Sequence, residues 1–338
     1  MRRALLLGVV LAVLLPAAPA RAASVAIFYY PWYGTPKLDG SYLHWSQSGH
    51  EPPGDIASSF YPAAGPYSSR NPRVLARQMD DMALAGVNTV IVSWWGWGST
   101  EDILLPQIII AAKRAHLKVA VHLEPYLGRT THSMVTDIEH LKTLGVSDYY
   151  VYDASGISLS DWALFRLSRP NGVRMFAETR FVGWAWSAGF DGVYTYDVFS
   201  LSGSFFGRYC AQASAVGLLC MPSIGPGYDN SGSTDFPDVK PRARGATYDA
   251  MWKAAIRAMP NGITITSYNE WHEGTQIEPA RVQYGYEDYE RAWGLRGRAA
   301  RNAYLCRTAQ WSAIFRAVSS GSLAKVHTPT AAPLCTGR

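Results

Sequence analysis

The chain has 338 residues, a formal net charge of +5 and 13% aromatic residues, which include 12 Trp and 20 Tyr. Its basic residues are dispersed, which argues against a nucleic-acid-binding protein. Beyond the N-terminal segment, no run is long and apolar enough to predict a membrane span.

The N-terminal segment has the pattern of a secretory signal peptide. Arg2 and Arg3 precede a short apolar run over residues 4–15, and Ala20-Arg21-Ala22 provides a small-residue cleavage site. We therefore expect residues 1–22 to be removed and the protein to be secreted, periplasmic or extracellular. The remaining residues 23–338 suit one α/β barrel domain in size, with a surface tail after about residue 319.

The four cysteines are Cys210, Cys220, Cys306 and Cys335. An even number of cysteines in an exported protein predicts disulfides, and four cysteines allow three connectivities. Proximity in the sequence favours Cys210–Cys220 and Cys306–Cys335. The cysteines lack the spacing of a zinc site, and we predict neither a metal nor a cofactor.

Short β-branched or aromatic runs alternate with segments of helical periodicity. The expected strands are Val25–Tyr30, Thr89–Ser93, Lys118–Leu123, Tyr149–Tyr152, Arg174–Ala177, Gly192–Tyr196, Leu218–Pro222 and Ile263–Ser267. Helical patterns include one that begins at Asn71-Pro72, one over Thr247–Met259 and one over Asp288–Phe315. Eight such strands predict the α/β class and a single (β/α)8 TIM barrel. A doubly wound open sheet is the alternative, but no Gly-rich phosphate turn follows the first strand.

Polar and aromatic residues gather where five of the expected strands end. The clusters are Tyr29-Tyr30-Pro31-Trp32-Tyr33-Gly34, Ser93-Trp94-Trp95-Gly96, His122-Leu123-Glu124-Pro125-Tyr126, Tyr194-Thr195-Tyr196-Asp197 and Ser267-Tyr268-Asn269-Glu270-Trp271-His272-Glu273. The carboxyl ends of the strands are where barrel enzymes place their active sites. We expect the five clusters to form one site.

Carboxylates are scarce in these clusters. Glu270, Glu273 and Glu278 follow the last strand, and Glu124 follows the third. Two carboxyl groups that flank a glycosidic bond are sufficient to hydrolyse it, one as acid and one to activate a nucleophile. Each Glu alone could be a solvated surface charge. His272, which could be a base or a metal ligand, is better explained as a hydrogen-bonding sugar contact.

Several of these motifs together resemble glycoside hydrolase family 99. They are Phe28–Gly34, Asp39-Gly40 with His44-Trp45, Asp55–Pro62, Gly65–Ser69, His122–Tyr126, Asp191–Tyr196 and Ile265–Glu278. The resemblance follows nearly the whole mature chain in the same order. It implies a (β/α)8 barrel that cleaves internal α-1,2-mannosidic bonds with retention and without a metal, and that releases a disaccharide from α-mannan or mannose-rich glycans.

The resemblance also implies the roles of individual residues. Glu270 would be the base that deprotonates the substrate's own 2-hydroxyl, which attacks C1 to form a 1,2-anhydro sugar. Glu273 would protonate the leaving oxygen and later activate water. Substrate contacts would come from Tyr30, Trp95, Glu124, Tyr194, Asn269 and His272. Trp in place of the Tyr of animal members at position 95 would favour mannose over glucose in the subsite beyond the cleaved unit.

Two alternatives remain open at this point. One is a barrel glycosidase for another α-linked glycan, and the other is a secreted carbohydrate-binding protein without turnover. The sequence leaves the oligomeric state open.

Overall fold

The computed structural model describes residues 23–321 and Cys335. The predicted signal peptide and most of the predicted tail lie outside the described residues. The central sheet is parallel throughout, in the order β7-β6-β5-β4-β3-β2-β1-β11-β8. Its strands are β1 Ser24–Tyr29, β2 Thr89–Trp94, β3 Lys118–Leu123, β4 Asp148–Val151, β5 Arg174–Glu178, β6 Gly192–Tyr194, β7 Leu219–Met221, β8 Ser223–Ile224 and β11 Gly262–Ile265.

Pro222 explains why nine strands build an eight-position barrel. This residue alone separates β7, which pairs with β6, from β8, which pairs with β11. Proline has no N–H to donate to a ladder, so the strand is interrupted there. The Pro222 carbonyl still accepts a hydrogen bond from the backbone N–H of Thr264 at 3.1 Å. β7 and β8 therefore occupy one position, and the predicted (β/α)8 barrel is confirmed.

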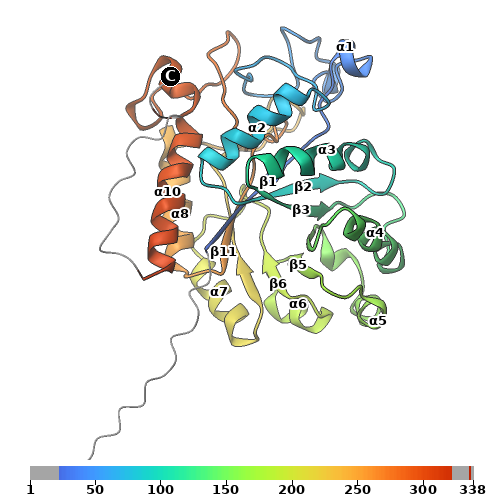
Figure 1. Cartoon of the computed structure of the whole chain (residues 1–338). Helices are drawn as coiled ribbons and strands as arrows, with labels where there is room; N and C mark the ends of the chain where they lie inside the picture. The colour runs from blue at the N-terminus through green and yellow to red at the C-terminus, as the bar shows by residue number, and fades with distance from the viewer. Residues whose placement is uncertain (1–22, 322–334, 336–338) are drawn as a thin grey trace, which may run out of the picture.

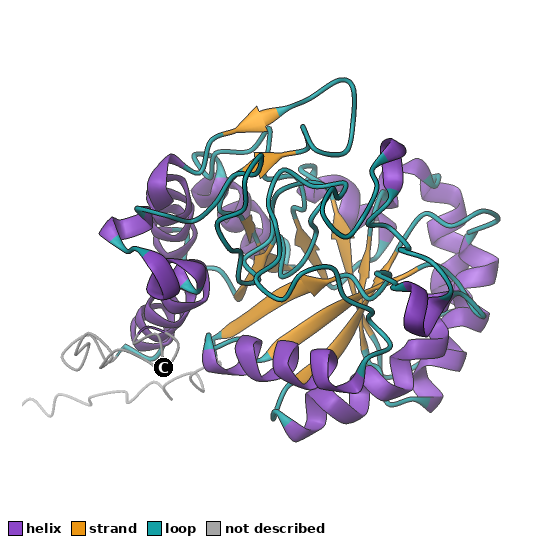
Figure 2. Ribbon diagram, turned by 90° about the horizontal axis from the view of Figure 1, so that it is seen from above, coloured by secondary structure: helices purple, strands orange, loops and turns teal. Residues whose placement is uncertain are grey.

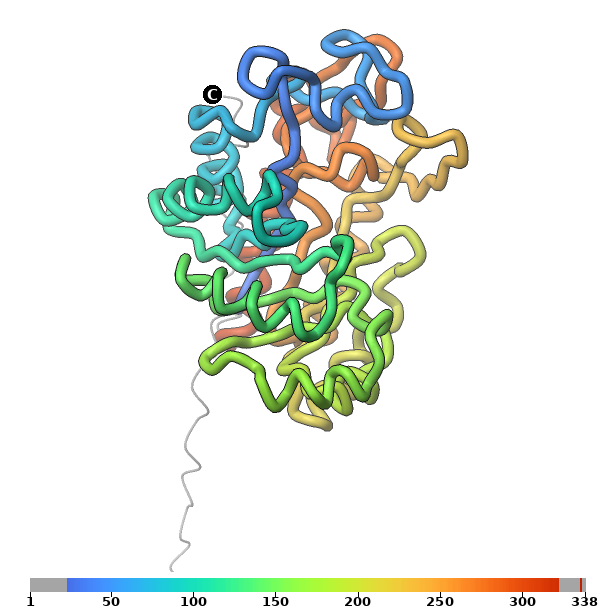
Figure 3. Tube along the Cα trace, turned by 90° about the vertical axis from the view of Figure 1, so that its right-hand side faces the viewer, coloured from blue at the N-terminus to red at the C-terminus, as the bar shows by residue number. Residues whose placement is uncertain are grey.

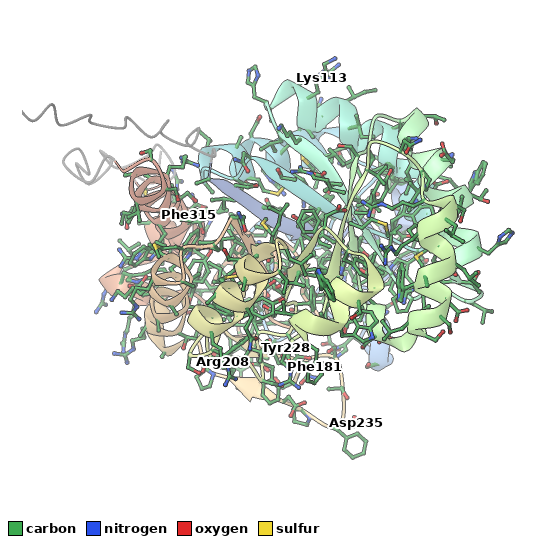
Figure 4. All side chains as sticks on the ribbon, turned by 90° about the horizontal axis from the view of Figure 1, so that it is seen from below. Lys113, Phe181, Arg208, Tyr228, Asp235 and Phe315 are labelled. Carbon is green, nitrogen blue, oxygen red and sulfur yellow. A yellow bond between two sulfur atoms is a disulfide. The ribbon has the colours of Figure 1, made fainter. Side chains whose placement is uncertain are left out.

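Helices surround the strands, as Figures 1 and 2 show. They are α1 Pro36–Asp39, α2 Pro72–Leu84, α3 Thr100–Arg114, α4 Thr131–Thr143, α5 Leu159–Ser168, α6 Val182–Ala188, α7 Phe206–Ala215, α8 Ala246–Arg257, α9 Gly297–Arg301 and α10 Ala303–Ser319. A hairpin of β9 Tyr228–Asp229 and β10 Val239–Lys240 stands out from the barrel (Figure 2). Asp235 lies at its far end (Figure 4).

The helix expected at Asn71-Pro72 begins there. The Asn71 side chain accepts a hydrogen bond from the backbone N–H of Arg73, and Pro72 is the first helical residue. The prediction of a single helical stretch over Asp288–Phe315 was wrong. The chain instead makes a 3-10 turn at Ala292–Gly294 and then α9 and α10. Trp293, Gly294 and Gly297 have φ values of 49°, 79° and 59°, a left-handed conformation that an α-helix does not contain.

The alternation of residues in β1 separates two cores. Val25, Ile27 and Tyr29 pack outward against the helices, whereas Ala26 and Phe28 point into the barrel. The inner layer is completed by aromatic and other apolar side chains from the strands and the residues that follow them, namely Tyr30, Ile91, Ala120, Tyr150, Phe176, Tyr194, Tyr196 and Met221. The barrel is thus filled, and its chemistry must lie at one end.

Both predicted disulfides are present. Cys210–Cys220 joins α7 to β7, and Cys306–Cys335 joins α10 to the C-terminal segment. Among the described residues, no helix has the length and apolar character needed to cross a membrane.

Candidate active site

The loop that follows β11 is closed at its base by hydrogen bonds. The backbone N–H of Ser267 donates to the carbonyl of Thr275 at 3.0 Å, and the two hydroxyls lie 2.9 Å apart. Gly274 has a φ of 59° and lies so close to Asp229 that a Cβ would come within 2.4 Å of the Asp229 carbonyl oxygen. This glycine is therefore required by both its backbone conformation and the close approach. The loop holds Glu270 and Glu273 at the carboxyl end of the barrel.

Glu270 is 3% exposed, and Glu273 is partly buried. The Glu270 carboxylate accepts a hydrogen bond from the backbone N–H of His272 at 3.2 Å. Burial, followed by the charge of Glu273, raises the pKa of Glu270 well above its usual range. Burial is also the main cause that raises the pKa of Glu273 to about 7. The charge of Glu273 disfavours the ionised form of Glu270, so the two carboxyls titrate as an interacting pair.

A chain of tyrosines ends on Glu273. The Tyr196 hydroxyl donates to Oε2 of Glu273 at 3.1 Å, and the Tyr30 hydroxyl lies 2.5 Å from that of Tyr196. Tyr196 has a single hydroxyl hydrogen, so Tyr30 donates to Tyr196. Burial raises the pKa of both tyrosines well above the usual value. They stay protonated, and as donors they stabilise the ionised form of Glu273.

Glu124 belongs to a second set of contacts, on β2, β3 and β6. Its Oε1 accepts a hydrogen bond from the Ser93 hydroxyl at 2.8 Å, and the indole N–H of Trp95 donates to Ser93 Oγ at 3.1 Å. His122 Nδ1 lies 2.8 Å from the same carboxylate oxygen, without hydrogen-bond geometry. His122 Nε2 lies 2.8 Å from the Tyr194 hydroxyl. The charge of Glu124 contributes to the raised pKa of both Glu270 and Glu273, so the two sets of contacts share one site.

His272 lies against two aromatic side chains from the loop after β1. Its Nε2 lies 2.8 Å from the carbonyl oxygen of His44, and Trp32 stacks on His44 with ring centres 4.6 Å apart. Burial lowers the pKa of His272, and burial and His272 together lower the pKa of His44 to about 4. Both rings are therefore neutral at pH 7. A neutral surface of this kind suits a polar but uncharged ligand.

Asn269 and Tyr194, both named from the sequence, are fully buried. The Asn269 side chain accepts from the backbone N–H of Tyr30 at 2.8 Å and donates to its carbonyl at 2.9 Å and to the Tyr67 hydroxyl at 3.2 Å. These bonds join the end of β1 to the loop after β11. Burial and contacts favour a positioning role for Asn269 and Tyr194. Tyr30 reaches Glu273 through Tyr196, and the backbone N–H of His272 bonds Glu270. Trp95 is linked to Glu124 through Ser93.

Glu278 lies apart from the pair although it belongs to the same loop. It accepts hydrogen bonds from Tyr67 Oη at 2.7 Å, Gln78 Nε2 at 2.9 Å and Trp271 Nε1 at 3.0 Å. It therefore anchors the loop against α2. In Figure 3, the blue segment after β1 runs beside the orange segment after β11, and bridges at Phe60–Glu287 and Pro62–Ala280 join the two.

Sequence reasoning missed three contributors, Tyr196, Trp32 and His44. Tyr196 and Trp32 lie in the clusters noted at strand ends, but nothing local in the sequence indicates that Tyr196 contacts Glu273. His44 comes from a loop without regular structure, so no periodicity could place it beside His272.

The chain resembles known proteins along most of its length. A model of glycosyl hydrolase family 99 matches residues 21–317. The glycoprotein endo-alpha-1,2-mannosidase of Xenopus laevis is 32% identical over 350 residues, covering 85% of this chain and 76% of that protein. A glycoprotein endo-alpha-1,2-mannosidase-like protein of Danio rerio is 34% identical over 314 residues, with coverage of 76% and 71%.

A solved structure agrees with these relatives. The family 99 endo-alpha-mannosidase from Bacteroides thetaiotaomicron is 29% identical and has a TM-score of 0.78, covering 87% of this chain and 98% of that one. The family model, the relatives and the barrel with its paired carboxyls all indicate the same family. The protein is a glycoside hydrolase, and its chain belongs to glycosyl hydrolase family 99.

Proposed function

We propose that this hydrolase is a secreted, retaining endo-α-1,2-mannosidase that acts on α-mannan or mannose-rich glycans through a 1,2-anhydro sugar. The 32% identity to an endo-alpha-1,2-mannosidase supports endo action on a mannoside. The observation that carries the mechanism is the pairing of the buried Glu270 with the partly buried Glu273, whose raised pKa values suit a pair that holds one proton near neutral pH.

The first step needs the shared proton on Glu273. Glu270 then takes the proton of the 2-hydroxyl, and the 2-oxygen attacks C1 as the C1–O bond to the leaving sugar breaks. Glu273 gives its proton to the leaving oxygen. In an α-mannoside the 2-hydroxyl and the leaving group are both axial and anti to each other, so this attack meets C1 from the back. The sugar supplies the nucleophile, unlike in the common scheme with a protein carboxylate.

The second step returns both protons. Glu273, now ionised, takes a proton from water, and the oxygen of that water attacks C1 and opens the three-membered ring. Glu270 returns its proton to the 2-oxygen. Each step inverts C1, so the product keeps the α configuration. The donated hydrogen bond from Tyr196 stabilises the ionised Glu273 between the two steps.

The remaining site residues bind and orient the sugars. Tyr30 orders Tyr196 beneath the pair, and Glu124 and His272 offer acceptors and rings to sugar hydroxyls and C–H faces. Trp95 would stack on the mannose next to the cleaved unit. Asn269 and Tyr194 hold these groups in place from below. The two disulfides support export, which the pattern of residues 1–22 also favours.

Product analysis tests this function. The purified mature protein should release disaccharides with an α-configured reducing end from yeast-type α-mannan and should leave α-glucan intact. Activity on α-glucan alone would refute the substrate, and release of single mannose units from chain ends would refute endo action.

A further inference from the structure

Trp97 is an exposed aromatic side chain beside the candidate site that the proposed mechanism leaves unused. It lies two residues beyond Trp95, in the turn after β2, and is 61% exposed. Gly96 and Gly98 on either side have φ values of 104° and 83°, so the turn depends on both glycines. A single exposed Trp is common on protein surfaces, and what distinguishes Trp97 is that its ring is held in a fixed position.

Contacts on one side hold the Trp97 ring in place. It stacks on the ring of His140 from α4, with centres 4.2 Å apart and planes 11° from parallel. His140 Nε2 lies 2.9 Å from Oδ1 of Asp102, a buried carboxylate in the first turn of α3. Asp102 also accepts hydrogen bonds from the Trp94 indole at 3.0 Å and the backbone N–H of Gly98 at 2.9 Å. One carboxylate thus fixes the supporting ring and the turn itself.

The turn lies on the same rim as Glu124. A Cβ at Gly96 would lie 3.3 Å from the Tyr126 ring, which packs edge-on against Trp94. This contact brings the loop after β3, with the fully exposed Leu127, beside the turn after β2. Two residues of chain reach at most about 7 Å, so the Cα atoms of Trp95 and Trp97 lie within about 7 Å of each other.

We propose that Trp97 forms an outer mannose-binding subsite, one unit beyond the subsite of Trp95 on the released side of the substrate. One ring face rests on His140, and the exposed surface is available to the apolar C–H face of a pyranose. Because the ring is already held, little side-chain entropy is lost when it binds. The inference rests on the proposed function and extends it: the enzyme accepts three mannose units on the released side and frees trisaccharides as well as disaccharides.

Two matched α-mannosides test this. They share the cleaved α-1,2 bond and the leaving sugar but carry two or three mannose units on the released side. In the wild type, kcat/KM should be higher for the longer substrate. Trp97→Ala should lower kcat/KM of the longer one about tenfold and leave the shorter one unchanged, since one lost stacking contact is of that size. Trp97→Phe should recover most of the difference.

The ratio of the two kcat/KM values does not depend on the folded fraction of a variant. Trp186→Ala serves as the control, because Trp186 is 57% exposed but lies in the last turn of α6, near the amino ends of the strands. Its ratio should match the wild type. An unchanged ratio in Trp97→Ala, or an equal loss on both substrates, would overturn the outer subsite and leave Trp97 as a cover for His140.

Binding distinguishes a failure of this subsite from a failure of the proposed function. If the wild type cleaves neither mannoside, the proposed function fails, and calorimetric titration with the longer one still decides the question. Weaker binding by Trp97→Ala than by Trp186→Ala would support the subsite. Equal binding by the two, or no binding to the wild type, would refute it.

Discussion

The Tyr196 hydroxyl donates a hydrogen bond to Oε2 of Glu273 at 3.1 Å, across 77 residues of sequence. The bond stabilises the ionised form of Glu273 and opposes the increase in pKa that burial causes. Tyr196 therefore lowers the pH at which the proposed acid exchanges its proton, without itself reacting.

Replacing Tyr196 by Phe should shift the pH profile of kcat/KM toward alkaline pH by about one unit, because the ionised Glu273 loses a donor. Tyr150→Phe is the control, since Tyr150 packs in the same inner layer of the barrel against Phe176. Its profile should match that of the wild type. Superimposable profiles for Tyr196→Phe and the wild type would show that this bond does not tune Glu273.

The wild-type profile should be bell-shaped around neutral pH. On the acid side, the pair takes up a second proton and Glu270 is lost as a base. Burial raises both pKa values, so this limb should lie above the ordinary Glu value of about 4.3. On the alkaline side, the last proton leaves and no acid remains for the leaving oxygen. A rate that stays constant down to pH 5 in initial-rate measurements would contradict the assignment.

Glu270→Gln and Glu273→Gln should each lower kcat by about 10²- to 10⁴-fold, the usual contribution of acid–base catalysis. Oligomannoside binding, measured by calorimetry, should persist because the amides keep the shape of the site. Glu287→Gln, an exposed residue after the same loop, is the control and should retain full activity. Either site variant with near-normal turnover would remove its residue from the mechanism.

Asp81 makes a separate prediction about stability. Its carboxylate accepts a hydrogen bond from Tyr268 at 3.3 Å, while burial and then Glu278 raise its pKa to about 7. The folded state therefore binds more protons than the unfolded state between about pH 4 and pH 7, and stability from Asp81 falls as pH rises through that range. Above pH 7 this loss is complete.

Asp81→Asn should flatten that part of the pH dependence, as measured by urea unfolding at pH 5 and pH 8. Asp235→Asn, at the exposed far end of the hairpin, should keep the wild-type difference between the two pH values. If Asp81→Asn has the same difference as the wild type, Asp81 ionises normally in the folded protein.

The barrel could be predicted because each strand has a recognisable pattern of residues in its own short segment of sequence. Runs such as Val25–Tyr30 and Lys118–Leu123 are apolar, β-branched and bounded by turns, and the observed β1 and β3 agree with them within a residue. The helix after Asn71 was likewise specified by its own cap. The prediction of a single helix after Asp288 was wrong because the helical periodicity continues through residues whose backbone has a left-handed conformation.

Contacts between distant loops were beyond such reasoning. His272 meets the carbonyl of His44 across 228 residues, and no periodicity relates the two. Glu278 shares a loop with Glu270 and Glu273 but faces α2, because the loop folds back on itself at Ser267 and Thr275. Proximity in sequence makes all three glutamates candidates for catalysis. Only the folded loop shows that Glu278 anchors the loop and that Glu270 and Glu273 form the pair.

Substrates altered at the 2-hydroxyl give the sharpest test of whether the sugar supplies the nucleophile. We would compare an α-1,2-mannoside with its 2-deoxy and 2-O-methyl analogues at the cleaved unit and follow the products by NMR. We expect an α-configured first product from the parent and no turnover of either analogue, although both should bind. Cleavage of the 2-deoxy analogue at a rate near that of the parent would contradict it, because the sugar would then not supply the nucleophile.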